Sequence, residues 1–121
     1  MLLIVGYEDE MDYVFGKIEG ELTKDVASSY FSKVAKVAEE YNCYKVITDL
    51  RDAQLIATRK ELEIMAKELK GVGLDSNFKR ALLISENIKD YKVWENFNFH
   101  HGFKDIRLFS NEEVALEWIK Q

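Results

Sequence analysis

The sequence contains no proline, only one cysteine and no long hydrophobic run. Without proline, the turns must be formed by Gly, Asn, Asp and Ser. Cys43 has no second cysteine with which to form an internal disulfide, so we expect the protein to work in the reducing cytoplasm. The apolar opening MLLIVG is shorter than a signal-peptide core (about 7–15 residues) or a membrane span (about 20 residues), so we expect no membrane insertion.

Basic residues are also scarce relative to acidic ones. Seventeen Lys and Arg residues oppose 22 Asp and Glu residues, for a net charge of −5. Nucleic-acid binding needs a concentrated basic surface, so we expect no nucleic acid as a partner. A length of 121 residues and a hydrophobic content of 47% are typical of one globular domain, residues 1–121.

The hydrophobic periodicity predicts five strands and four helices. The strands are expected over residues 2–5, 13–21, 44–50, 79–85 and 105–110, and the helices begin near residues 23, 58, 88 and 110. The link at 8–12 is too short for a crossover helix, so the first two strands should form an antiparallel hairpin. The order ββαβαβαβα then predicts an α/β domain with a five-stranded mixed sheet, whose later strands are parallel. Apolar runs at 45–50 and 81–84 are typical of central strands that are covered on both faces.

Two helix starts carry the pattern of a capping box. Residues 58–61 read T-x-x-E and residues 110–113 read S-x-x-E. In each, we expect the hydroxyl and the Glu side chain to satisfy backbone N–H groups that the first helical turn leaves unpaired.

The segments TDLRDA and IRLFSNEEVALEWI resemble the STAS superfamily, and more narrowly its SpoIIAA-like group of small bacterial proteins. The resemblance covers nearly the whole chain. It implies a module that works by protein–protein contact, without enzymatic activity or a cofactor, and whose partner is a kinase-like protein or another regulator. In regulatory members, a Ser within Asp-Ser-Ser-Gly begins the helix after the third strand, and its phosphorylation by the partner kinase dissolves the complex.

Thr58 corresponds to that Ser. Ala57 replaces the preceding Asp, and Arg59 and Lys60 stand where Ser-Gly would follow. Two interpretations of Thr58 stay open: a helix cap alone, or a cap that is also a phosphoacceptor, since a helix N-terminus favours a phosphate. We expect the partner surface to include Asp49, Arg51, Asp52, Arg59 and Lys60.

An aromatic stretch around the third helix suggests an alternative function. Tyr91, Trp94 and Phe97 belong mostly to a core, yet they are numerous enough to line a pocket for a small apolar, lipid-like ligand. A second copy of the chain, which would give a homodimer, is a further candidate partner.

Catalytic and metal sites have little support. Asp49 and Asp52 resemble part of the acidic pocket of a response-regulator receiver, but the link at 8–12 cannot hold the helix that a receiver needs. The adjacent His100 and His101 point in different directions and make a poor chelate. The sequence has no G-x-S-x-G motif and no P-loop, so we predict no enzyme and no metal site.

Overall fold

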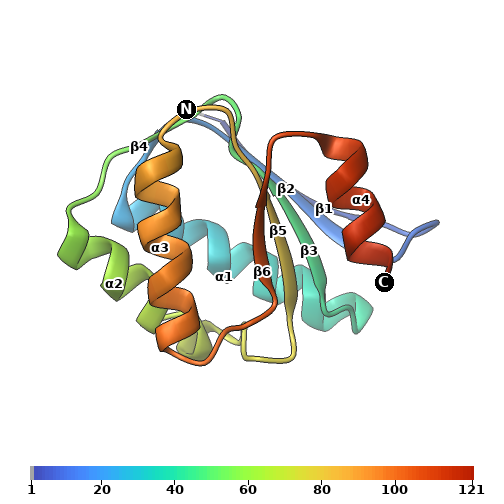
Figure 1. Cartoon of the computed structure of the whole chain (residues 1–121). Helices are drawn as coiled ribbons and strands as arrows, with labels where there is room; N and C mark the ends of the chain where they lie inside the picture. The colour runs from blue at the N-terminus through green and yellow to red at the C-terminus, as the bar shows by residue number, and fades with distance from the viewer. Residues whose placement is uncertain (1) are drawn as a thin grey trace.

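The computed structural model describes residues 2–121, which form a mixed sheet with helices on both faces (Figure 1). The strands are β1 (Leu2–Glu8), β2 (Tyr13–Leu22), β3 (Lys45–Asp49), β4 (Ala53–Leu55), β5 (Lys79–Leu83) and β6 (Ile106–Phe109). The helices are α1 (Lys24–Tyr41), α2 (Arg59–Lys67), the short 3-10 helix η1 (Lys70–Val72), α3 (Ile88–His100) and α4 (Glu112–Lys120). The predicted α/β class and element order are confirmed, with one strand added.

The strand order in the sheet is β1-β2-β3-β5-β6, and β4 pairs with β2 outside this path. β1 and β2 form the predicted antiparallel hairpin, with Leu2 opposite Glu19 and Glu8 opposite Tyr13. Every other pairing is parallel. The short acidic link therefore sets the hairpin, and each later crossover carries a helix.

The helices form two unequal layers. Helices α1, α2 and α3 lie on one side of the sheet and α4 lies on the other (Figure 1). The smaller core cluster joins Ala115 and Ile119 of α4 to Ile47, Ala81 and Leu83 of the central strands. β3 and β5 are therefore covered on both faces, as their continuous apolar runs predict.

The segment between β3 and α2 contains β4, a strand that the sequence did not predict. Ala53 and Leu55 are 5% and 7% exposed, and β4 runs parallel to the last residues of β2. The N–H of Gly20, whose φ is +97°, donates to the Asp52 carbonyl at 3.1 Å. β2 extends past the end of β3, so its backbone needs another partner, and β4 supplies it. The sequence did not reveal β4 because its three residues are too few to show a periodicity.

The start of α4 also corrects a prediction. The N-cap is Asn111, whose Oδ1 accepts from the Val114 N–H at 3.2 Å, and not Ser110. Asn and Ser are comparable N-caps, so the S-x-x-E pattern placed the cap one residue too early, and with Val114 as the third helical residue the predicted capping box does not form. Helix α2 ends at Lys67, and the 3-10 helix η1 follows it and ends at Gly73 in the left-handed conformation.

Gly16 allows α1 to approach the sheet closely. The Tyr30 side chain from α1 lies over Gly16, and its hydroxyl is 2.6 Å from the Thr48 hydroxyl on β3. A Cβ at position 16 would lie 2.0 Å from Tyr30 Oη. Within residues 2–121, no helix has the length and apolar character that crossing a bilayer requires.

Candidate functional site

Charged side chains gather where the parallel strands end. We call this set the charged rim: Lys17, Glu19, Asp49, Arg51, Asp52 and Glu112. Lys17 lies opposite Asp49 in the β2–β3 register, and Glu112 begins α4 after the neighbouring strand β6. Ligands and partners of open α/β sheets commonly contact the carboxyl ends of strands. The rim is therefore the first candidate for a functional surface.

Asp49 and Arg51 form the best-ordered part of the charged rim. Arg51 Nε is 3.0 Å from Asp49 Oδ1, Nη2 is 2.8 Å from Oδ2, and the Arg51 backbone N–H donates to Oδ1 at 3.0 Å. This is the bidentate fork that arginine forms with carboxylates. The Asp49 side chain is only 4% exposed, so its carboxylate orients Arg51 and is covered by it. The sequence had instead suggested direct contact between Asp49 and a partner.

These contacts shift the pKa values of both Asp49 and Arg51. Burial would raise the pKa of Asp49, but the hydrogen bonds from Arg51 and the charges of Arg51 and Lys17 outweigh it and lower the pKa below its usual range. The hydrogen bond to Asp49 in turn raises the pKa of Arg51. Asp49 is thus held as a carboxylate, and a group that stays ionised is poorly suited to general acid–base catalysis near neutral pH.

Lys17 and Glu112 extend the charged rim in opposite directions. Lys17 Nζ is 3.2 Å from Asp52 Oδ2 and 3.6 Å from Glu19 Oε1. Arg51 Nη2 is 3.5 Å from Glu112 Oε1, and the Ser85 hydroxyl donates to the Arg51 carbonyl at 2.7 Å. Alternating charges in fixed positions suit recognition of a complementary surface.

No metal-ion cluster accompanies this arrangement in the part of the chain that the structure describes: no three His, Cys, Asp or Glu side chains are grouped to hold one.

Thr58 lies where the capping pattern predicts. Its Oγ1 accepts from the Glu61 N–H at 3.1 Å, and its own N–H donates to Glu61 Oε1 at 2.9 Å, so the T-x-x-E capping box is confirmed. The residue is exposed at the N-terminus of α2. The Thr58 hydroxyl therefore caps α2 on a residue that is exposed to solvent.

Arg59 and Lys60 follow Thr58 but do not both lie beside it. The Arg59 guanidinium lies 5.3 Å from the centroid of the Phe97 ring on α3, a cation–π contact. Lys60 is exposed. Arg59 is thus directed toward α3, and its part in the partner surface stays a prediction.

Two exposed isoleucines follow residues that contact each other, one just after β4 and one at the start of α3. Ile56 is 46% exposed and Ile88 is 59% exposed; we call them the isoleucine pair. The Leu55 N–H donates to Asn87 Oδ1 at 3.3 Å, so the chain neighbours that precede the two isoleucines are in contact. β4 separates the charged rim from Thr58, and the isoleucine pair supplies apolar surface on that side.

The three aromatic residues of the predicted pocket lie mainly in the core. Tyr91 and Trp94 are 1% and 2% exposed, and only Phe97 is partly exposed. The space beside Trp94 and Phe31 is too small for a water molecule. These rings fill the layer between the helices and the sheet, so they do not line an open cavity together.

Several residues of this region were missed by sequence reasoning. Lys17, Ser85 and Glu112 come from three elements that only the sheet register brings together. One feature of the sequence pointed to Lys17: in the alternating pattern of β2, it lies on the face opposite to the buried residues. Ile56 and Ile88 had none, because single apolar residues at element ends are ordinary in any sequence.

The chain matches no protein-family model and no curated protein. Solved structures do resemble it. An uncharacterised protein of the DUF3478 family from Shewanella loihica PV-4, with a SpoIIAA-like fold, has a TM-score of 0.62 at 14% identity, over 97% of this chain and 93% of that one.

Two structures of SpoIIAA are similar as well. The anti-sigma factor antagonist in its unphosphorylated form has a TM-score of 0.56 at 14% identity, with 96% of each chain covered. The phosphorylated form of this Bacillus cell fate determinant has a TM-score of 0.52 at 15% identity, over 96% of this chain and 97% of that one. Such identities establish likeness of fold alone. The chain has a SpoIIAA-like fold, which is the fold that the resemblance in its sequence implied.

Proposed function

We propose that the chain is a non-enzymatic regulatory module that binds a protein partner at the carboxyl edge of its sheet. The observation that carries this proposal is the exposed isoleucine pair beside an ordered charged rim. Protein interfaces typically combine an apolar centre with a polar rim, and arginine is enriched in them. Similarity of fold to an anti-sigma factor antagonist supports a regulatory role.

The geometry of Arg51 favours binding. Its guanidinium is held by Asp49 before any partner arrives, so little side-chain freedom remains to be lost on association. Glu112 lies 3.5 Å from the Arg51 guanidinium, and Asp52 adds a further carboxylate to the charged rim. A partner surface with complementary charges and an apolar centre would match this arrangement.

Phosphorylation of Thr58 is the finer part of the proposal. A phosphate would add a charge of about −1.5 to −2 at the N-terminus of α2 and accept from free N–H groups there. It would also lie beside the Glu61 carboxylate, which now accepts from the Thr58 N–H. Like-charge repulsion would then displace the Glu61 half of the capping box and change the surface next to Ile56.

The contact surface can be tested by affinity capture with the full-length chain as bait and quantitative mass spectrometry. Ile56→Ser and Ile88→Ser remove apolar contacts, and Arg51→Lys keeps a cation for Asp49 but loses the fork. The same proteins should be depleted with all three baits. Tyr44→Ser is the matched control, because Tyr44 is 49% exposed just before the amino end of β3, and it should recover them in full. Equal recovery with all four baits contradicts the proposed surface.

Phosphorylation is tested separately. The peptide that contains Thr58, from protein isolated from its natural source, should include a form heavier by the mass of HPO₃. Absence of that form across growth conditions leaves Thr58 as a cap only, without affecting the proposed contact surface.

A further inference from the structure

The two edge strands of the sheet differ in how well they are protected against pairing with another chain. β1 and β6 are the edges, because they end the strand order β1-β2-β3-β5-β6. β6 has only four residues, and its Arg107 guanidinium lies 5.6 Å from the centroid of the Trp118 ring. Short length and charged side chains are common protections of an edge. The β6 edge therefore resists a further strand.

β1 lacks these protections. Its seven residues, LLIVGYE, include no Lys, Arg or Pro, and Glu8 at the end carries the only charge. They pair with β2 without a break in register, so no bulge turns β1 away from a neighbour. Every second N–H and C=O of β1 points away from β2, and no other strand in residues 2–121 pairs with it. Such an edge is a ready template for one more strand.

The face of β1 on the α4 side of the sheet is apolar and exposed. The odd-numbered residues of β1 pack in the core on the α1 side, so Leu2, Ile4 and Gly6 lie on the other face. Leu2 is 40% exposed and Ile4 is 44% exposed, since α4 packs on β3 and β5 instead. Apart from the chain neighbours of Gly6, no described residue has an atom within 4 Å of a Cβ at this position. The surface beside Ile4 therefore has space for a further side chain.

The nearest cation to this face is already paired. Lys17 lies opposite Ile4 in the β1–β2 register, and its Nζ is 3.2 Å from Asp52 Oδ2 and 3.6 Å from Glu19 Oε1. A strand that pairs with β1 therefore meets backbone groups and aliphatic side chains, and it needs no charge of its own to neutralise this edge. The matching strand is uncharged and apolar along most of its length. β1 itself has this composition.

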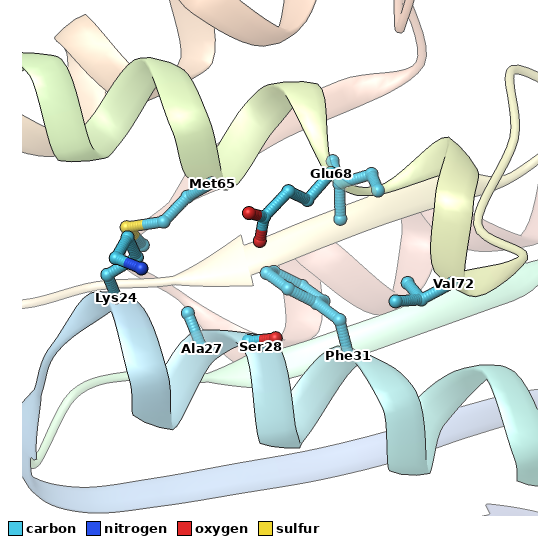
Figure 2. A pocket seen from close by; sticks show the side chains of 8 residues that line it. Lys24, Ala27, Ser28, Phe31, Met65, Glu68 and Val72 are labelled. Carbon is cyan, nitrogen blue, oxygen red and sulfur yellow. The ribbon is translucent and has the colours of Figure 1, made fainter.

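The helix layer on the other side of the sheet is closed, in contrast to this edge. Phe31 of α1 and Val72 of η1 point into the crevice between α1 and α2 (Figure 2). The space that they leave is about 10 Å³, no more than a single water molecule needs. No ligand or chain segment fits there.

We propose that β1 pairs with β1 of a second copy of this chain, antiparallel and about a two-fold axis at Val5. The axis gives both strands the same spacing of donors and acceptors, so each outward N–H meets a carbonyl. Ile4 then lies opposite Gly6 of the second copy, where the structure leaves open space, and the two Glu8 residues lie at opposite ends of the pair. This dimer goes beyond the proposed function, because neither the isoleucine pair nor Thr58 takes part in it.

Other pairings between two copies are less favourable. A parallel pair in register would bring the two Glu8 carboxylates together, and like charges on neighbouring strands are destabilising. Pairing of β1 with β6 of another copy would leave a free edge at each end and continue into a fibre. The antiparallel pair closes, and only the protected β6 edges stay free.

Sedimentation velocity on the full chain tests the dimer. The wild type should sediment with twice the mass of one chain, which is 14.1 kDa. Ile4→Lys places two like charges on adjacent positions of the paired edge and should raise the dissociation constant of the dimer about tenfold or more. Val114→Lys is the matched control, because Val114 is 55% exposed on α4, and it should leave this constant unchanged. A wild type that is monomeric at about 100 μM, or equal constants in the two variants, overturns the proposal.

Amide hydrogen exchange on the wild type locates the interface without a substitution. The N–H groups of β1 that point away from β2 should be protected in the dimer and should lose this protection on dilution to the monomer. The outward N–H groups of β6 are the internal control and should exchange rapidly at every concentration. A dimer in which the outward N–H groups of β1 stay unprotected overturns the proposal.

A charge pair tests the position of the two-fold axis. An axis at Val5 places position 4 opposite position 6 of the second copy, so Ile4→Lys mixed with Gly6→Glu gains one Lys–Glu pair. This mixture should form mixed dimers about threefold more tightly than Ile4→Lys mixed with Gly71→Glu. Gly71 is the matched control because it is exposed, far from β1 in the chain, and also has open space around it. Equal affinity of the two mixtures overturns pairing about Val5.

Discussion

At the scale of single residues, Gly16 and Tyr30 hold α1 against the sheet. Gly16→Ala would place a Cβ 2.0 Å from Tyr30 Oη, so the ring must move and its hydrogen bond to Thr48 must lengthen. We expect a loss of about 1–3 kcal/mol in the free energy of unfolding, the usual cost of overpacking. Urea unfolding measures this change.

Gly6→Ala is the matched control on the neighbouring strand. Apart from its two chain neighbours, no described residue has an atom within 4 Å of a Cβ at position 6, so stability should be nearly unchanged. Similar losses in the two variants would show that the Tyr30 contact is not the cause.

Asp49 should make stability depend on pH. Its pKa in the folded protein lies below the value of about 3.9 that an Asp has in an unfolded chain. The folded state then binds fewer protons, so Asp49 contributes fully above the unfolded pKa and its contribution is lost as the pH falls through the folded pKa. Asp49→Asn should lower stability at pH 7 and flatten its decline from about pH 5 downward.

Urea midpoints measured from neutral to acidic pH test this dependence. Asp52→Asn is the control, because it changes a carboxylate of the same rim whose side chain is 62% exposed. If Asp49→Asn declines with pH as steeply as the wild type, the ion pair with Arg51 is not a source of acid sensitivity.

At the scale of elements, the start of α2 depends on its capping box. Thr58→Ala removes the acceptor of the Glu61 N–H and should cost about 1 kcal/mol of stability. Thr58→Ser keeps a hydroxyl and should cost much less. Thermal unfolding of the two variants distinguishes these outcomes, and equal melting temperatures would mean that the cap contributes little.

The elements also show why sequence reasoning succeeds in some places and fails in others. The hairpin, the three parallel crossovers and the capping box of α2 follow from periodicity and link length, which are local properties. β4 was missed because three residues show no period, and it forms only because β2 extends beyond β3. The cap of α4 was assigned to Ser110 instead of Asn111 because the two residue types are equally good N-caps by sequence.

At the scale of the whole molecule, the second face of the sheet depends on one helix. Ile119 of α4 is 0% exposed and packs on the central strands. Ile119→Ala should therefore destabilise the protein by about 2–5 kcal/mol, as expected for a large truncation in a core.

Val114→Ala is its control on the same helix. Val114 is 55% exposed, so this variant should change stability by no more than about 0.5 kcal/mol. Chemical denaturation of both variants measures the difference, and a small effect at Ile119 would mean that α4 contributes little to the stability of the domain.

The candidate site was only partly foreseeable. Asp49, Arg51 and Asp52 stood out because they lie at the carboxyl end of a buried strand. Their partners Lys17 and Glu112 did not, because they come from positions 17 and 112 and meet only through the register of the sheet. The reverse error occurred at Tyr91 and Trp94, whose composition suggested a pocket and whose packing closes it.

Local order along the chain was sufficient to establish the fold class, the leading hairpin and the cap at Thr58, because periodicity, link length and capping act within a few residues. Long-range packing established the rest: which charges meet at the rim, that Asp49 lies under Arg51, and that Arg80 is buried without an acidic partner among residues 2–121. Those properties depend on strand register and on the fit between layers. Contacts between residues far apart in the chain set both, and neither leaves a pattern in a single sequence.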